Sequence, residues 1–490
     1  MDTFTLASAH APGPAPLLDS LVDAARVLPG DDAYALTRHG VETFLAELAR
    51  PTDTPLPAQP WGVDALIARI DQRLSAHIDA ILHHPDFQRL EAAWRGLRFL
   101  VDRTDFRENI RIELVSVSRE ALRDDFDNAG EPTRSALYKL LYTAEYGQFG
   151  GQPYAAVISD AQFGPGPRDM ALLDSIARIC AVAHAPFIAA AAPSFFGIAS
   201  HAALPDLKDL ASLFEGPQYI KWRAFRGADH ARYVGLSLPS MLLRLPYGDD
   251  TMPTRTFRYV EDISAGNAAF LWGSAAFAFA SRLSASFAAD RWCANIIGPG
   301  GGGTVGGLPV YTYTSLGELQ CKIPTEALIS ERREYELAEQ GFIALTMRKN
   351  SDNAAFFSAN SVQAPQHFGT SESAHEAELN HRLGTQLPYM FIVNRLAHYI
   401  KVIQRENIGT WKERADIENA LNQWIRQYVA DMDNPAPGVR GRRPLRQARI
   451  LVKDVEGDPG WYEVSLQVRP HFKYMGASFT LSLVGRLDKQ

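Results

Sequence analysis

The glycine-rich segment Gly298–Gly307 is the stretch of this chain whose composition comes closest to a chemical site. Gly301, Gly303 and Gly306 have the GxGxxG spacing that lets a backbone approach the phosphates of a dinucleotide. Such a loop has to open a helix, because the helix N-terminus holds the pyrophosphate. Here the residues that follow, Val310–Tyr313, are typical of a strand. We therefore expect a flexible surface loop and keep a nucleotide-binding α/β enzyme as an alternative.

The histidines suggest a second chemistry, zinc binding. His375, Glu376 and His381 approximate the HExxH motif, but Leu379 stands at the second ligand position, and the two histidines do not share a helix face. Other histidines have no cysteine or carboxylate at ligand spacing, which is typical of surface or hydrogen-bonded core residues: His83, His84, His201 and His230. There is no GxSxG nucleophile motif either. The sequence therefore predicts no catalytic residue, cofactor or metal site.

Composition is that of a globular protein and argues against several classes. The 490 residues are 46% hydrophobic and 21% charged, and the length fits about three domains. The net charge of −7, from 49 basic and 56 acidic residues, argues against nucleic-acid binding. Three cysteines without a CxxC pair indicate a reducing cytoplasm. The N-terminus lacks a signal-peptide pattern, and the longest apolar run, Ala268–Ala280, is too short for membrane insertion.

The first 60 residues are expected to form a flexible arm that carries a short helix. Leu17–Leu28 is amphipathic, and the Pro29-Gly30 pair ends it. About three turns are marginal alone in water. This helix therefore either packs as an N-terminal helix or docks into a groove of another protein. A second helix, Tyr34–Arg50, precedes a proline-rich linker.

Helix-like and strand-like segments alternate from residue 61 to about residue 370. Val63–His83 has helical periodicity, and Pro85 opens a helix whose apolar residues we expect to face inward: Phe87, Leu90, Trp94, Leu97 and Leu100. The strand-like runs are Ile110–Val117, Tyr154–Ser159, Phe187–Ala191, Tyr233–Leu238, Val310–Tyr313, Phe342–Arg348 and Ala355–Ser358. The helical runs between them are Arg119–Asn128, Ser135–Tyr146, Arg168–Ala183, Leu207–Phe214, Asn267–Ala288 and Glu326–Gln340. This order predicts a layered α/β domain with a mainly parallel sheet.

The last 120 or so residues have a different pattern. Ala374–Gln404 and Thr410–Asp431 are expected to be helices, and Gln447–Leu487 is expected to form a three-stranded meander. Its apolar residues alternate with polar ones: Tyr462, Val464, Leu466 and Val468, then Phe479, Leu481 and Leu483. Two interpretations stay open. The meander closes a domain core, or its unpaired edges accept strands from other subunits.

Several longer blocks resemble one known family. They are His84–Leu97 (HPDFQRLEAAWRGL), Phe195–Gly197, Tyr219–Trp222, Tyr233–Leu236, Arg244–Gly248 (RLPYG) and Phe270–Gly273. With these blocks the sequence resembles, from about Leu17 to Leu487, the large subunit of the contractile sheath of type VI secretion systems, the TssC/VipB/EvpB family.

The resemblance implies a structural protein without catalysis. Members of this family pair with a small sheath subunit (TssB, or VipA-like) and polymerise as a helical tubule around a tube of Hcp protein. The sheath contracts to propel that tube. A ClpV-like AAA+ ATPase then dismantles the contracted sheath. The implied location is the bacterial cytoplasm, with the sheath docked through a baseplate to the inner membrane.

The resemblance also implies roles for particular residues. The ATPase would contact one face of the N-terminal helix, formed by Leu17, Leu18, Leu21, Val22 and Arg26. The apolar residues of the meander named above would lie in the inter-subunit sheet. The helix Thr410–Asp431 is our candidate for contact with the inner tube, through Lys412, Arg414 and Glu418.

The expected domains are an arm at residues 1–60, an α/β sheath domain at 61–370 and a C-terminal sheath domain at 371–490. A sheath of a phage-tail-like particle is an alternative, which would share the fold but lack the ATPase-binding helix. The nucleotide-binding enzyme is a second alternative, and it requires a helix directly after Gly307.

Overall fold

The structure is a computed structural model. It describes residues 18, 19, 22, 27–31, 33–48, 60–255, 257–315, 317–347, 351–369, 371–406, 414–432, 435–455, 462–471 and 481–487. The expected flexible arm before residue 18 and the linker at residues 51–59 lie outside the described residues. Two compact units are present, residues 1–74 and 75–490. None of the helices in the described part of the chain has the length and apolar character needed to cross a bilayer.

The first unit contains α2 (Tyr34–Leu48) and the first part of α3 (Pro60–Leu82). Both helices agree with the sequence pattern. Proline residues fit the first turn of a helix, because the first N–H groups have no partner within the helix. Pro60 begins α3 in this way, and Pro85 begins the next helix, α4 (Pro85–Asp102).

The centre of the second unit is a mixed sheet of six strands in the order β1-β2-β3-β9-β10-β6. The first four strands are parallel, and the last two are antiparallel to their neighbours. This agrees with the predicted mainly parallel sheet. The strands are β1 (Val157–Phe163), β2 (Phe187–Ala191), β3 (Val234–Leu238), β6 (Thr304–Val305), β9 (Phe342–Met347) and β10 (Ala354–Phe356).

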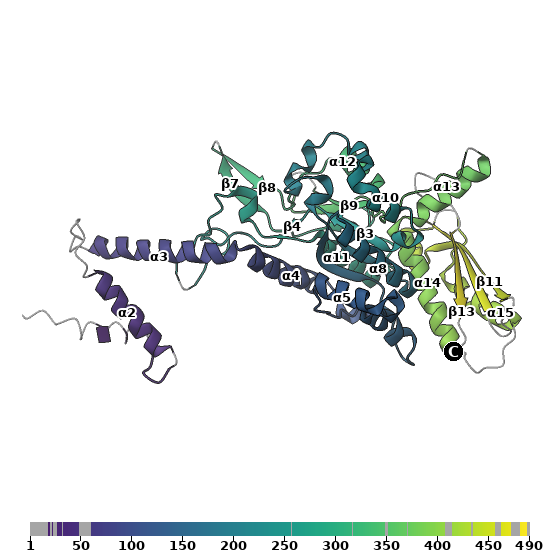
Figure 1. The fold of residues 1–490 in the computed structure, drawn as a ribbon, viewed down its shortest axis with the longest axis horizontal. Helices are drawn as coiled ribbons and strands as arrows, with labels where there is room; N and C mark the ends of the chain where they lie inside the picture. The colour runs from purple at the N-terminus through teal and green to yellow at the C-terminus, as the bar shows by residue number, and fades with distance from the viewer. Residues whose placement is uncertain are drawn as a thin grey trace, which may run out of the picture. The chain divides into compact units, whose positions relative to one another are not determined.

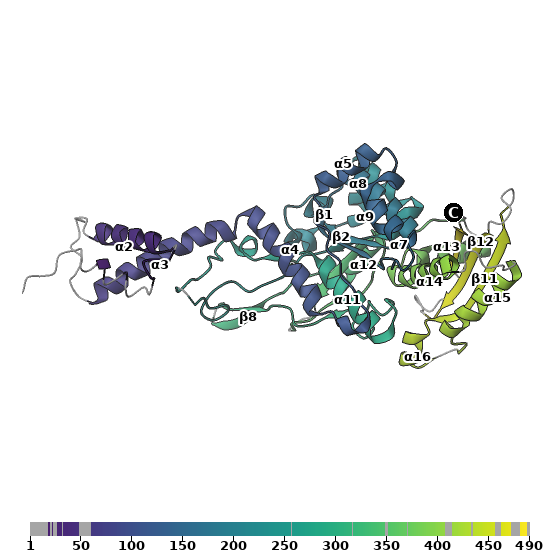
Figure 2. The ribbon, with the colours of Figure 1, turned by 90° about the horizontal axis from the view of Figure 1, so that it is seen from below.

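Helices cover both faces of this sheet, and alternate residues of each strand contact different helices. In β9, Phe342 packs with α8 (Pro167–Ala183), whereas Ile343 packs with α11 (Ala275–Asp290). Figure 2 shows β1 and β2 between α8 and α11. Because both faces are buried, the strands are almost entirely apolar, as parallel strands usually are.

The other helices of this region surround the same sheet. They are α5 (Arg119–Ala129), α6 (Ala136–Tyr138), α7 (Ala144–Tyr146), α9 (Leu210–Glu215), α10 (Ile220–Arg226) and α12 (Glu331–Glu339). Serine N-caps begin several of them, since the hydroxyl accepts from an unpaired N–H of the first turn. Ser118 caps α5, Ser274 caps α11 and Ser330 caps α12. Two small sheets complete the region: β4 (Met241–Leu242) with β5 (Trp272–Gly273), and β7 (Tyr311–Ser315) with β8 (Glu318–Lys322).

The C-terminal region combines four helices with a three-stranded antiparallel sheet, in yellow in Figure 1. The helices are α13 (Glu372–Gly384), α14 (Leu387–Glu406), α15 (Arg414–Ile425) and α16 (Pro437–Arg442). The strands are β11 (Leu445–Asp454), β12 (Tyr462–Pro470) and β13 (Leu481–Leu487), paired in chain order. The predicted meander is therefore confirmed.

Two predictions about local structure are wrong. The segment 110–117 is not a strand; it lies outside any sheet, and Leu114 and Val115 are 65% and 54% exposed. Three apolar residues of α4 do not face inward, because Phe87, Leu90 and Trp94 are 37%, 57% and 59% exposed. Periodicity locates an apolar face of a helix, but it does not say whether the same chain covers that face.

Candidate assembly site

The C-terminal sheet is built on one buried face. Val464, Leu466 and Val468 of β12 are at most 4% exposed and pack with Ile450 and Val452 of β11. Ile450 lies opposite Leu466 in the register, and Val452 lies opposite Val464. The core beneath them is completed by residues of α14 and α15. The sheet is thus half-buried, which explains the strict alternation in its sequence.

The structure places the residues predicted for strand exchange on two different strands. Tyr462, Val464, Leu466 and Val468 belong to β12, which is paired on both sides and has no free edge. Leu481 and Leu483 belong to β13, which lies at an edge of the sheet. Phe479 lies outside the described residues. The exchange of strands itself stays a prediction, and only β13 contributes an edge to it.

The residues predicted to touch an inner tube lie at the start of α15. Arg414 donates to the carbonyl of Val452 at 3.0 Å, and Glu418 accepts from the N–H of Val452, also at 3.0 Å. Lys412 lies outside the described residues. Both described side chains are therefore engaged with β11 of the same chain, and contact with a tube stays a prediction.

Two of the five residues predicted for ATPase docking are described, and both are buried. Leu18 is 7% exposed and Val22 is 1% exposed. Between them, Asp19 is exposed and pairs with Arg38 of α2 at 3.6 Å. The other three, Leu17, Leu21 and Arg26, lie outside the described residues. In this structure the helix face predicted for docking is thus partly covered.

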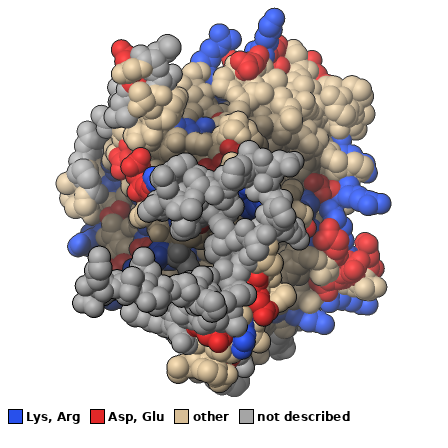
Figure 3. All heavy atoms as spheres, turned by 90° about the vertical axis from the view of Figure 1, so that its left-hand side faces the viewer, with Lys and Arg blue, Asp and Glu red and all other residues tan. Residues whose placement is uncertain are grey.

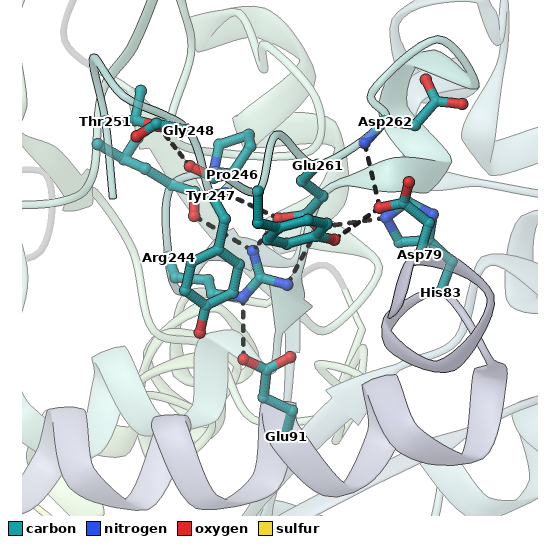
Figure 4. Close-up of polar contacts among 12 residues, drawn as sticks. Asp79, His83, Glu91, Arg244, Pro246, Tyr247, Gly248, Thr251, Glu261 and Asp262 are labelled. Carbon is teal, nitrogen blue, oxygen red and sulfur yellow. Dashed lines mark hydrogen bonds and ion pairs between the residues drawn. The ribbon is translucent and has the colours of Figure 1, made fainter. Parts of the chain in front are cut away.

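A largely buried group of ionisable side chains joins α4 to the loop at residues 243–262 (Figure 4). The guanidinium of Arg244 donates to both carboxylate oxygens of Glu261, at 2.6 and 3.1 Å, and to Glu91 of α4 at 2.9 Å. His83 contacts Glu261 at 3.2 Å. The side chains of Arg244 and Glu261 are 4% and 0% exposed. We call these four residues the Arg244 cluster: His83, Glu91, Arg244 and Glu261.

Hydrogen bonds favour the charged forms of Arg244 and Glu261 despite their burial. Burial acts to raise the pKa of Glu261, but hydrogen bonds from Arg244 and from the N–H of Tyr247 outweigh it and lower that pKa. Burial acts to lower the pKa of Arg244, but its two carboxylate partners raise it. The arrangement pairs the buried charges of Arg244 and Glu261 and fixes α4 against the loop.

No role is predicted from sequence for the Arg244 cluster, although a signal is present. Glu91 lies in the block HPDFQRLEAAWRGL, and Arg244 opens the block RLPYG. Gly96 of the first block packs so closely that a Cβ there would lie 2.4 Å from the ring of Phe277. Two of the blocks that carry the family resemblance are therefore halves of one buried contact.

The glycine segment forms a turn whose tip, residues 299–302, is exposed as expected of a surface loop, while Gly303 and Val305 are buried. The N–H of Gly298 donates to the carbonyl of Phe356 at 2.7 Å, and the carbonyl of Gly303 accepts from the N–H of Phe356 at 3.0 Å. The next residues form β6, an edge of the six-stranded sheet. Residues 306–310 are not helical. The nucleotide-binding alternative required a helix there, so the structure contradicts it.

Two of the histidines named from the sequence, His201 and His230, are hydrogen-bonded to carboxylates of the same chain. His201 Nδ1 lies 3.2 Å from Glu326, and His230 Nε2 lies 2.6 Å from Asp174. Burial acts to raise the pKa of Glu326, but hydrogen bonds from His201 and from nearby serines lower it to about 2. No group of three or more potential metal ligands occurs among the described residues. On the face that Figure 3 shows, basic and acidic side chains are interspersed among the described atoms.

Comparisons with known proteins agree with this architecture. The family model of the EvpB/VC_A0108 tail sheath N-terminal domain matches residues 64–363. That of the EvpB/VC_A0108 tail sheath gpW/gp25-like domain matches residues 376–487. The division falls near the predicted boundary at residue 370, which stays a prediction.

A curated relative covers most of the chain. The type VI secretion system sheath protein TssC1 of Pseudomonas aeruginosa is 39% identical over 431 residues, which are 87% of this chain and 86% of the relative. A cryo-EM structure of the sixfold-symmetrised baseplate of the anti-feeding prophage covers 78% of this chain and 81% of that chain, with 9% identity and a TM-score of 0.33, too low to carry an argument. The two family models and the relative confirm the resemblance: this chain belongs to the EvpB/VC_A0108 tail-sheath family and is a structural subunit of a type VI secretion sheath.

Proposed function

We propose that this chain is the large subunit of the sheath and polymerises with a small sheath subunit (TssB/VipA-like) into a helical tubule. The tubule surrounds a tube of Hcp protein, contracts to propel it and starts from a baseplate at the inner membrane. The chain works in the bacterial cytoplasm and catalyses no reaction.

The observation that supports this proposal most is the C-terminal sheet with an edge strand, β13, at the outside. A strand from another subunit can add to such an edge through backbone hydrogen bonds. Those bonds resist pulling along the sheet while the subunits they connect rotate relative to one another. A contractile polymer needs connections of this kind.

An uncovered apolar face gives further support. Phe87, Leu90 and Trp94 follow one another at helical spacing on α4, and all three are exposed. Single exposed apolar residues are ordinary, but a contiguous row of large ones is typical of a surface that an assembly buries.

Electron microscopy in negative stain tests the proposal. The chain is produced alone and together with a small sheath subunit (TssB/VipA-like). We expect tubules with a cogwheel cross-section only when both proteins are present. Monodisperse particles under both conditions would contradict the proposal.

We further propose that the N-terminal helix docks onto a ClpV-like ATPase through Leu17, Leu18, Leu21, Val22 and Arg26. Since Leu18 and Val22 are buried in this structure, docking requires that the helix leave its present packing. Leu21→Asp should abolish ATPase binding in a pull-down and leave tubules intact. Loss of tubules in this variant would show instead that the helix belongs to the core.

A further inference from the structure

The two edges of the C-terminal sheet are not equivalent. At the outer edge of β11, the side-chain amide of Asn422 pairs with one residue of the strand. Its Nδ2 donates to the carbonyl of Ile450 at 2.7 Å, and its Oδ1 accepts from the N–H of Ile450 at 3.0 Å. A side-chain amide has the same donor and acceptor as a peptide group. Asn422 therefore occupies the place that the backbone of a neighbouring strand would take.

α15 also bonds to the backbone of Val452, the next outward-facing residue of β11. Glu418 accepts from the N–H of Val452, and Arg414 donates to the carbonyl of Val452. At the other end of β11, the carbonyl of Leu445 accepts from the N–H of Ala430 at 2.8 Å. Between Leu445 and Ile450, the outward-facing N–H and carbonyl of Ala448 have no partner among the described residues. The β11 edge is thus closed at Ile450, at Val452 and at the carbonyl of Leu445.

The spacing of the three α15 residues explains how a helix can close a strand. Arg414, Glu418 and Asn422 are four residues apart and lie on one face of α15. Four helical residues rise about 6 Å, and two strand residues rise about 6.8 Å. The step from Glu418 to Asn422 therefore matches the step from Val452 to Ile450, and Arg414 bonds to Val452 as well. Figures 1 and 2 both show α15 beside β11.

The outer edge of β13 is free in the described part of the chain. Outward-facing and inward-facing residues alternate along each strand of an antiparallel sheet. Ile450 faces outward and lies opposite Leu466, so Leu466 turns its backbone groups toward Leu483 of β13. On β13 the outward-facing residues are therefore Ser482, Val484 and Arg486. No described residue bonds to them, and the helix that closes β11 has no counterpart here.

We propose that α15 acts as a permanent substitute for a neighbouring strand, so that the sheet accepts strands only at β13. This inference rests on the proposed function, because it specifies which edge the assembly uses. The occupant is an extended segment of another sheath subunit with an apolar side chain at every second residue. The apolar side chains of this segment have to continue the buried face that Leu466 and its neighbours form. In a strand, every second side chain points to the same face, so apolar residues at every second position do this.

Proline substitutions at the two edges test the proposal, since proline lacks an N–H and is tolerated on edge strands. Val484→Pro removes an outward-facing N–H from β13, and Ala448→Pro removes one from β11. Each variant is produced with the small sheath subunit, and tubules are counted by electron microscopy after circular dichroism has confirmed folding. We expect Val484→Pro to lose tubules and Ala448→Pro to keep them.

The wild-type pair separates this inference from the proposed function. If wild type forms no tubules, the proposed function fails. If wild type forms tubules, three results contradict the proposal that strands add only at β13. They are loss of tubules with Ala448→Pro alone, loss of tubules with both folded variants, and loss of tubules with neither.

A second measurement examines the closure itself. Asn422→Ala should speed the exchange of the Ile450 amide by about tenfold or more, because both bonds from the side chain are lost. Asn419→Ala is the matched control, since Asn419 is an exposed asparagine on the same helix. Equal exchange in the two variants, measured on the chain without its partner, overturns the proposal.

Discussion

Arg244 is the residue on which the Arg244 cluster depends. It is the cation between the carboxylates of Glu91 and Glu261, so its removal leaves Glu261 without a guanidinium partner and Glu91 with Arg95 alone. We expect Arg244→Met to lower the free energy of unfolding by about 3–5 kcal/mol, the usual cost of breaking a buried ion pair. Urea unfolding of the unassembled chain measures this loss.

A surface ion pair on α4 is the control for that variant. Arg89 pairs with Asp86, and their side chains are 79% and 70% exposed. Arg89→Met should change the free energy of unfolding by less than about 1 kcal/mol, because solvent screens the pair. Equal losses in the two variants would show that burial adds nothing to the Arg244 cluster.

His398 makes stability depend on pH. It lies on α14, donates from Nε2 to the carbonyl of Ala183 at 3.0 Å, and burial lowers its pKa to about 4. Between that pKa and the ordinary value of about 6.5, the unfolded chain binds a proton that the folded chain does not, so stability falls as pH falls. From about pH 7.5 to about pH 5 this amounts to about 2 kcal/mol.

The variant His398→Gln tests that dependence, because glutamine keeps a donor and does not titrate. Urea unfolding at the two pH values should show a smaller loss in the variant than in wild type. Burial also lowers the pKa of His184, which adds in the same direction and remains in both proteins. An unchanged pH dependence in His398→Gln would exclude His398 as its source.

Single residues show the limit of sequence reasoning at this scale. His201 and His230 are satisfied by Glu326 and Asp174, which are distant in the sequence. Residue type and local spacing predict that such a histidine is structural, but they cannot identify its partner. Arg244 and Glu91 were missed for the same reason, since only the fold brings them together.

At the scale of elements, the glycine turn before β6 gives a sharp prediction. A Cβ at Gly303 would lie 2.5 Å from the carbonyl oxygen of Phe356, whereas at Gly300 it would meet nothing within 4 Å. Gly303→Ala should therefore cost about 1–3 kcal/mol of unfolding free energy by forcing β6 away from β10. Gly300→Ala should be nearly neutral. Thermal unfolding measures the midpoint temperature of each variant. Equal midpoints for Gly303→Ala and Gly300→Ala would contradict the prediction that Gly303 is the closely packed glycine.

Strands were predicted correctly where a sequence pattern fits only one kind of element. The buried strand β2 and the meander β11–β13 were found from apolar runs and strict alternation. The segment 110–117 has a strand-like pattern as well, but no neighbouring strand pairs with it. The predicted helix Asn267–Ala288 begins only at Ala275, because the residues before it form a short turn and β5. Pairing depends on neighbours that a local pattern does not contain.

At the scale of the whole molecule, α14 ties the two family domains together. Met390 packs in the core on the α8 face of the central sheet, Phe391 packs in the core on the α11 face, and Ile392 packs beneath the C-terminal sheet. One helix thus completes three cores. The two domains that the family models match, residues 64–363 and 376–487, therefore share part of their interior.

This sharing predicts how a fragment behaves. Residues 371–490 produced alone would expose Leu387, Met390 and Phe391, which are at most 4% exposed in the full chain. We expect the fragment to aggregate or to unfold without a cooperative transition, while the full chain keeps one. Urea titration followed by near-ultraviolet circular dichroism distinguishes them. A cooperative transition in the fragment would show that the C-terminal domain is independent.

The protection of β11 by α15 covers a short length of strand. Arg414 and Glu418 both bond to Val452, and Asn422 bonds to Ile450, so one face of the helix covers two outward-facing residues of the strand. α15 ends at Ile425, and the N–H of Ala430 bonds separately to the carbonyl of Leu445 at the far end. A longer β11 would therefore carry unpaired backbone groups beyond the reach of α15, where a further strand could add.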